Sequence, residues 1–331
     1  MRIPQSPPKY DELLMQLAAT PKRIALILET TYDFDAKNGY KHWDIIRHMT
    51  PPRELTSNEL WLGIKFHRLS QLREILLTDK GEEKHFVYSL PDEVINGLHE
   101  TDLGAGGAIA MPEPITNPHS RNQYLVRSLI QEAITSSQLE GAATTRETAK
   151  EMIRSGRQPR DKSERMILNN FLTMQRIQEW KNKPLDPDLL FEIHRCVTDQ
   201  TLEKPDAAGR LRRPDESIVV QDNITGDTVF VPPHADLLAK RMASMCLFAN
   251  GTSGERFIHP VIRAILLHFW LAYDHPFVDG NGRTARALFY WAMLRNKYWL
   301  FEFVSHTCPA ISRTIAIGCD FRSFETGQHF A

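Results

Sequence analysis

One stretch, residues 275–286, constrains this chain more than any other, and it reads His-Pro-Phe-Val-Asp-Gly-Asn-Gly-Arg-Thr-Ala-Arg. Gly280, Asn281 and Gly282 at its centre supply backbone freedom and free N–H groups where an anion can sit. Asn281 is a good N-cap residue, and a helix that begins there points its positive end at the same anion. The stretch therefore predicts a phosphate-binding loop that runs into the first turn of a helix.

Charged side chains flank the expected loop on both sides. Arg283 and Arg286 are three residues apart, so they can reach the anion from neighbouring faces of the helix. His275 and Asp279 stand just upstream, where a proton acceptor and a magnesium ligand would be useful. These residue types favour chemistry on a phosphate group.

The stretch resembles the complete active-site motif of the Fic family, His-Pro-Phe-x-Asp-Gly-Asn-Gly-Arg-x-x-Arg, at every specified position. Such a match is far more specific than a short glycine pattern, so a Gly-rich helix start with surface charges is the less favoured alternative. Fic enzymes typically move AMP from ATP to a Ser, Thr or Tyr hydroxyl of a protein. The resemblance therefore implies a nucleotidyltransferase, a protein adenylyltransferase that uses ATP and Mg²⁺ and acts on a protein target or on itself.

The resemblance also implies a role for each residue of the motif. His275 takes the proton of the attacking hydroxyl, and Asp279 holds Mg²⁺. The N–H groups of residues 280–282 stabilise the charge that develops on the α-phosphate. Arg283 and Arg286 bind the β- and γ-phosphates, Arg286 by a bidentate contact.

A second motif lies at the end of a helix expected over residues 121–139. A carboxylate at a helix C-terminus opposes the helix dipole, so Glu140 needs a nearby cation or an exposed position. Ser136-x-x-x-Glu140-Gly141 is similar to the inhibitory motif of regulated Fic proteins, whose Glu pairs with the second Arg of the active-site motif, here Arg286. A solvated Glu at a helix end is the alternative.

Two β-prone runs on either side of residues 222–227 predict a β-hairpin. In Fic proteins a short hairpin called the flap lies over the active site and docks the target segment by strand addition. The resemblance implies this role here, and an incidental surface hairpin is the alternative. The runs are Ile218, Val219 and Val220 before the turn, and Val229, Phe230 and Val231 after it.

Apolar residues at helical spacing predict a mainly α fold, and the resemblance makes it a Fic-type helical bundle with the hairpin flap over the active site. The most apolar helix is expected over residues 257–273 and delivers His275 at its end. A capping box formed by Thr56 and Glu59 opens another helix, which is expected to run on to Leu76.

Three segments are expected along the chain. They are an N-terminal helical segment (1–115), a Fic catalytic core that includes the inhibitory helix (116–304) and an irregular C-terminal tail (305–331). Family members usually continue with helices that close the nucleotide site, so the tail puts the completeness of the adenine pocket in question. His194, beside the apolar face of a helix expected over 187–197, is interpreted as a buried structural residue without chemistry.

The composition indicates the class of protein and the compartment in which it works. Hydrophobic residues make up 42% of the 331 residues and charged residues 24%, as in soluble globular proteins. The net charge of −1 provides no general attraction to nucleic acid or an anionic membrane. Four scattered cysteines and the lack of a signal peptide favour a cytoplasmic protein without a membrane segment. A homodimer is left open.

Three alternatives to AMP transfer stay open at this point. The same fold transfers other phosphate-containing groups in some relatives, or removes AMP again with help from the inhibitory Glu. A Fic-like binding or regulatory protein without activity is the second alternative. The third is a DNA-binding regulator, and the near-neutral charge argues against it.

Overall fold

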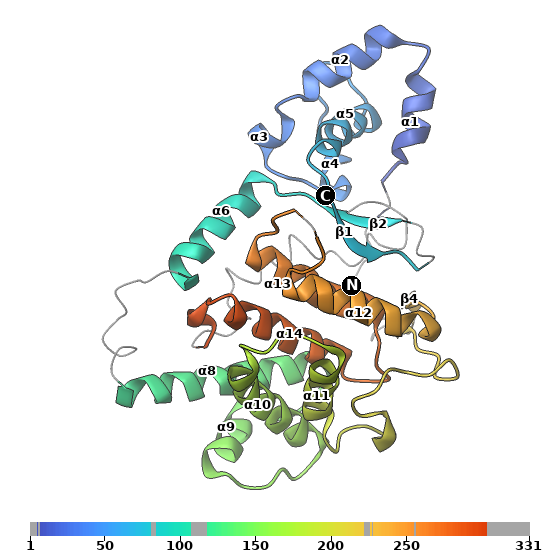
Figure 1. Ribbon diagram of the computed structural model, residues 1–331. Coiled ribbons are helices and arrows are strands. Elements are labelled where there is room, and N and C mark those ends of the chain that lie inside the picture. Colours follow the sequence, from blue (N-terminus) through green and yellow to red (C-terminus); the bar gives the residue numbers. More distant parts are fainter. Residues whose placement is uncertain are drawn as a thin grey trace. The chain divides into compact units, whose positions relative to one another are not determined.

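The computed structural model describes residues 5–302, apart from 6, 81–83, 107–117, 222–225, 227 and 255. The C-terminal tail predicted over 305–331 and the boundary predicted near residue 115 lie outside the described residues. The described part is mainly helical, as predicted, and divides into two compact units (Figure 1). Residues up to 75 together with 85–97 belong to the first unit, and residues 76–84 with those from 98 onward belong to the second. Across the described residues, no helix combines the length and the apolar character needed to cross a bilayer.

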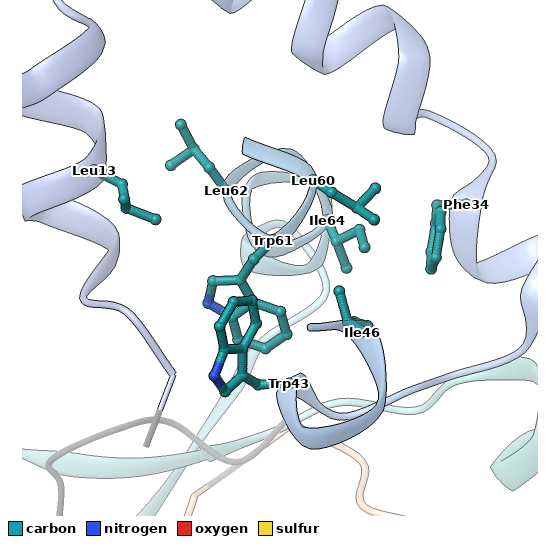
Figure 2. Close-up of a cluster of buried hydrophobic side chains, with 8 residues drawn as sticks. All are labelled: Leu13, Phe34, Trp43, Ile46, Leu60, Trp61, Leu62 and Ile64. Carbon is teal, nitrogen blue, oxygen red and sulfur yellow. The ribbon is translucent and has the colours of Figure 1, made fainter. Parts of the chain in front are cut away.

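The first unit is built around one central helix, α5. Figure 2 shows how Leu60, Leu62 and Ile64 spread from this helix towards its neighbours, while the ring of Trp61 lies beside that of Trp43. Burial of this apolar surface is what holds such short helices together. The helices of this region are α1 (Tyr10–Leu17), α2 (Pro21–Thr31), α3 (Phe34–Asn38), α4 (Trp43–Ile46), α5 (Ser57–Leu69) and α6 (Asp92–Thr101).

The capping box predicted at the start of α5 is present. The Thr56 hydroxyl accepts from the Glu59 N–H at 3.2 Å, and the Glu59 carboxylate accepts from the Thr56 N–H at 2.8 Å. Two N–H groups at the helix start are thereby satisfied. This part of the expectation rests on local chemistry alone and is confirmed.

The expected continuation of that helix to Leu76 is wrong. The helix ends at Leu69, and the following residues form strand β1 (Arg73–Thr78), which pairs with β2 (His85–Tyr88). Ile75 and Leu77 are buried while the residues between and beside them are more exposed, which is the period of a strand. The leucine spacing fits a helix equally well, so the pairing with β2 decides the structure.

The second unit surrounds helix α14, which is buried on nearly every side, and its residues 287–294 are apolar on every face. Helix α13 packs along α14, α10 and α11 contact it from other directions, and α8 lies against α10 (Figure 1). The α-helices of this unit are α8 (Pro118–Leu139), α9 (Arg146–Ser155), α10 (Lys162–Trp180), α11 (Pro187–Thr198), α12 (Leu238–Asn250), α13 (Pro260–Asp274) and α14 (Asn281–Arg295).

The predicted hairpin is present but short. It consists of β3 (Val220–Gln221) and β4 (Thr228–Phe230), paired antiparallel with an irregular register. Ile218, Val219 and Val231 lie outside the two strands. Prolines at 232 and 233 follow directly and lack the N–H that a longer ladder would need.

We expect Gly63→Ala to destabilise the first unit by about 1–3 kcal/mol, because α2 and α5 approach too closely for a side chain at this position. A Cβ there would lie 2.8 Å from Ile27 Cγ2 and closer still to Thr31 Oγ1. Urea unfolding followed by tryptophan fluorescence measures the change. Thr31→Ala in the same chain should recover part of the loss. Stabilisation, which Ala gives at an open helix position, would contradict this packing.

Candidate active site

The predicted phosphate loop joins α13 to α14. His275 caps the C-terminus of α13 in the left-handed conformation, with φ 45°, and Gly280 precedes α14 with φ 82°. Gly280 cannot be replaced freely, since a Cβ there would lie 2.5 Å from Thr198 Cγ2 of α11. The loop is therefore a tight turn pressed against α11.

Asn281 differs from the sequence prediction in one respect. It is the first residue of α14, and Gly280 takes the N-cap position that was expected for it. The Asn281 side chain turns back instead, where Oδ1 accepts from the Phe277 N–H at 2.9 Å and Nδ2 donates to the Phe277 carbonyl at 2.8 Å. This pair of bonds closes the loop on itself, a tertiary use that outweighs the local capping preference of Asn.

The backbone donors that were predicted to bind phosphate lie in and beside the first turn of α14. The first N–H groups of a helix have no acceptor within it, which leaves those of Asn281 and Gly282 directed out of the helix start. The third N–H of the predicted set, that of Gly280, donates to Asp279 Oδ1 at 2.5 Å. Two of the three expected donors thus remain for an anion, together with the helix dipole.

The ring of His275 has the protonation pattern of a base. Its Nδ1 lies 3.2 Å from the Ala272 carbonyl, which can only accept, so Nδ1 carries the proton in the neutral ring. The lone pair is then on Nε2. Burial lowers the pKa of His275 below its ordinary value of 6.5, which keeps the ring neutral at neutral pH.

His194 supports the loop from below. Its Nε2 donates to the Asp279 carbonyl at 2.9 Å, its Nδ1 accepts from the Gly209 N–H at 2.9 Å, and its ring stacks on Phe277 with centroids 3.7 Å apart. Burial lowers the pKa of His194 to about 4. The expectation of a buried structural His is confirmed, but the sequence did not reveal that this His holds the active-site loop.

Arg283 is placed differently from Arg286. Its guanidinium is almost fully buried, Nη1 donates to the Val197 carbonyl at 2.7 Å, and Nη2 lies 3.8 Å from Asp279 Oδ1. Among the described residues its Nε has no hydrogen-bond partner. Arg283 therefore lies beneath the loop, and its predicted contact with a phosphate stays a prediction.

Arg286 is held by the motif predicted to be inhibitory. Its Nε donates to Ser136 Oγ at 2.7 Å, and its Nη2 donates to the Ser136 carbonyl at 3.0 Å and to Glu140 Oε1 at 2.7 Å. The side chains of Arg286 and Glu140 are 17% and 28% exposed, so the ion pair is partly shielded from solvent. The structure brings together the Ser, Glu and Arg that sequence reasoning linked across 150 residues.

The Glu140 carboxylate also lies against the start of α14. A Cβ on Gly282 would be 2.9 Å from Glu140 Cδ and closer still to Oε1. The carboxylate therefore stands at the positive end of α14, where negative charge is favoured. This position, together with Arg286, offsets the unfavourable location of Glu140 after the C-terminus of α8.

Asp279 can bind a magnesium ion only together with oxygen ligands from a substrate phosphate. Its side chain is half exposed and is the loop's single carboxylate. The described residues contain no cluster of three or more His, Cys, Asp or Glu side chains that could hold a metal by themselves. Mg²⁺ is commonly bound by one or two carboxylates plus phosphate oxygens and water, so the donor set is compatible with a nucleotide-borne ion.

The hairpin is anchored near His275 by one aromatic side chain. The ring of Phe230 packs on Tyr273 of α13 with centroids 4.9 Å apart, and Lys80 Nζ lies 4.6 Å from the Phe230 centroid. Phe230 thus attaches the hairpin to α13, whereas the neighbouring Val219 and Val231 are exposed, and their predicted contact with a target stays a prediction. Ile218 and Val220 are partly exposed, and the Val229 side chain lies outside the described residues.

Residues 184–293 match the Fic/DOC family. Over this segment the chain is similar to "Protein adenylyltransferase Fic" from Nematostella vectensis, with 37% identity over 108 residues, and to the protein of the same name from Drosophila melanogaster, with 34% over 109 residues. "Protein adenylyltransferase fic-1" from Caenorhabditis briggsae is 31% identical over 111 residues. The matches cover 33–34% of this chain but only 20–22% of these relatives, about a fifth of their length.

Two solved structures share the fold over more of the chain. Fic-1 (aa134–508) from C. elegans gives a TM-score of 0.50 at 17% identity and covers 86% of this chain and 76% of that one. A Fic family protein from Desulfovibrio desulfuricans G20 gives 0.50 at 20% identity and covers 68% and 63%. At these identities the likeness establishes the arrangement of helices and nothing finer.

We expect acid to destabilise the second unit through His194. Its pKa is lower in the folded state than in the unfolded chain, so the unfolded chain binds a proton first, and stability falls as pH drops from about 6.5 towards 4. The loss between pH 7 and pH 5 should be about 2 kcal/mol. His194→Gln should be less stable at pH 7 but show a flatter pH dependence of the unfolding free energy. Equal slopes for the two proteins would contradict the assignment.

Proposed function

We propose, from the match of residues 184–293 to the Fic/DOC family and from the geometry of the site, that the chain is a protein adenylyltransferase that transfers AMP from ATP to a hydroxyl of a target protein. The observation that carries the proposal is the neutral His275, with Nε2 as its proton acceptor, beside a helix start with free N–H donors. The names of the curated relatives support the same reaction. The target residue is a Ser, Thr or Tyr of another protein or of this chain.

In the proposed reaction, His275 Nε2 takes the proton of the target hydroxyl as its oxygen attacks the α-phosphorus of ATP. A bond forms between that oxygen and the phosphorus, and the bond to the oxygen bridging the α- and β-phosphates breaks. Pyrophosphate leaves with the electron pair of the broken bond. The N–H groups of Asn281 and Gly282 and the dipole of α14 stabilise the charge on the reacting phosphate.

Three charged residues hold the nucleotide in this proposal. Asp279 holds Mg²⁺, which neutralises phosphate charge when bound. Arg286 binds the γ-phosphate once Glu140 has moved away. Arg283 contributes its positive charge from beneath the loop, and its contact with the β-phosphate requires a small shift of the guanidinium away from the Val197 carbonyl.

Glu140 acts as an autoinhibitor in this scheme. Its carboxylate occupies the positive end of α14, which the reacting phosphate would need, and one donor of Arg286, which the γ-phosphate would need. ATP can then bind only with its phosphates displaced from the productive position.

The hairpin β3–β4 binds the target segment, which adds as a strand at the edge of the hairpin, and the exposed Val219 and Val231 contact that segment.

Removal of AMP is the second candidate function. The specific observation in its favour is a carboxylate, that of Glu140, beside the loop that would hold the phosphate. A carboxylate in that place is a base for an attacking water.

A cytoplasmic location remains part of the proposal, in keeping with the free thiols of Cys196 and Cys246 in the described residues.

We expect Glu140→Gly to raise AMP transfer by about 10- to 100-fold, because a charge-assisted bond to Arg286 of about 1.5–3 kcal/mol no longer competes with the γ-phosphate. The measurement is incorporation of label from ATP into protein. Label in the α-phosphate reports AMP transfer, and label in the γ-phosphate reports phosphate transfer. Mass spectrometry locates the adduct.

Glu147→Gln is the matched control for this substitution, since Glu147 is an exposed carboxylate on the following helix. It should leave incorporation unchanged. Equal labelling by wild type and Glu140→Gly would remove the inhibitory role. Loss of a pre-formed AMP adduct from wild type but not from Glu140→Gly would favour the second candidate.

We expect His275→Ala in the Glu140→Gly background to lower transfer by at least about 100-fold without unfolding the chain, because the proton acceptor is lost. In the parent protein the rate should depend on one ionisation with a midpoint below pH 6.5, since burial lowers the pKa of His275 and only the neutral ring accepts a proton. A pH profile of kcat tests this. A midpoint above 6.5, or a labelled target with His275→Ala, would refute the assigned base.

A further inference from the structure

Arg212 contacts two parts of the proposed site that are far apart in sequence, the turn that carries His275 and the segment that follows β4. It is 7% exposed and stands after the turn at Gly209, on the way into the hairpin. Its Nε donates to the His275 carbonyl at 2.9 Å, and its backbone N–H donates to the Pro276 carbonyl at 2.9 Å. Its Nη2 donates to the carbonyl of Pro233, which follows β4.

The backbone that Arg212 holds needs an external constraint. His275 has φ 45°, and a non-glycine residue keeps such a conformation only where its surroundings fix it, at a cost of about 1 kcal/mol or more. The His275 and Pro276 carbonyls are both held by Arg212. The orientation of the His275 ring follows from this backbone turn together with the bond from Nδ1 to Ala272.

The chemistry of the guanidinium suits this task. The planar guanidinium holds the His275 and Pro233 carbonyls in fixed directions. The flexible ammonium of a lysine cannot hold the same two carbonyls with the same geometry. Burial of an arginine is tolerated only when its donors are engaged. The neighbouring arginines have other partners: Arg210 forms an ion pair with the largely buried Glu216, and Arg213 forms one with the exposed Asp206.

We propose that Arg212 is a positioning residue that links the segment after β4 to the turn that carries His275. A target docked on the hairpin is thereby held at a fixed position relative to His275, the proton acceptor. This inference rests on the proposed transferase function for its catalytic consequence. The mechanical part, a link between hairpin and loop, stands on the three hydrogen bonds alone. Arg212 touches neither nucleotide nor target in this scheme.

The first test measures steady-state transfer in the Glu140→Gly background with Arg212→Lys and Arg212→Met, and with Arg213→Met as the matched control. Arg212→Lys should lower kcat by about tenfold or more, since a misplaced reacting group costs up to about 100-fold, while the KM for ATP changes less than about twofold. Arg212→Met should be slower still, and Arg213→Met should equal the parent. A kcat of Arg212→Lys within about twofold of the parent, or an equal loss in Arg213→Met, would overturn the proposal.

The second test does not depend on activity, so it separates failure of this inference from failure of the proposed function. Hydrogen exchange measured by mass spectrometry should be faster in Arg212→Lys over residues 270–282 and over 228–236 together, and unchanged in helices α10 and α12. Faster exchange in only one of the two segments would overturn the link. A uniform rise over the whole second unit would also overturn it, because Arg212 would then serve the fold in general. The lysine variant decides the matter if Arg212→Met fails to fold.

Discussion

The positive end of helix α14 is the feature on which the rest of the site depends. The helix is buried through the middle of the second unit, and its first turn reaches the loop after α13 with unsatisfied N–H groups. Negative charge is favoured at that point, and the chain supplies it from its own residues in the form of Glu140. A substrate phosphate would compete for the same place and for the same arginine. Activity and its suppression are thus proposed to use one electrostatic site.

The loop before α14 gains its shape from side chains that take no direct part in the proposed reaction. Asn281 binds the backbone of Phe277, His194 binds the carbonyl of Asp279, and Arg212 binds the carbonyl of His275. Each uses a buried polar side chain to fix a backbone group that would otherwise need water. A loop fixed in this way needs little reorganisation when charge develops on a bound phosphate, which is where preorganised sites gain their advantage.

Local patterns predicted much of this arrangement, and long-range contacts decided the remainder. The loop, the helix after it and the hairpin follow from motifs whose residues carry their own geometry. The pairing of Glu140 with Arg286 follows only from the resemblance to the inhibitory motif of Fic proteins. The N-cap role expected of Asn281 is a local preference, and it yields to the backbone of Phe277. The burial of Arg283 depends on a carbonyl of α11, and β1 depends on its partner strand, so neither can be read from neighbouring residues.

The contacts of Arg286 indicate how much must move for the proposed switch to open. Ser136 is buried at the end of α8 and accounts for two of the three hydrogen bonds, and neither involves the Glu140 carboxylate. Glu140 follows the end of α8, and the backbone around it is fixed, because the N–H groups of Glu140 and Ala142 donate to the Ser137 carbonyl at 3.1 and 3.0 Å. In the proposed switch, release therefore needs rotation of the Glu140 side chain, with α8 and the backbone that follows it in place. Arg286 would stay oriented by Ser136, with the donor that Glu140 had occupied now directed at the incoming phosphate.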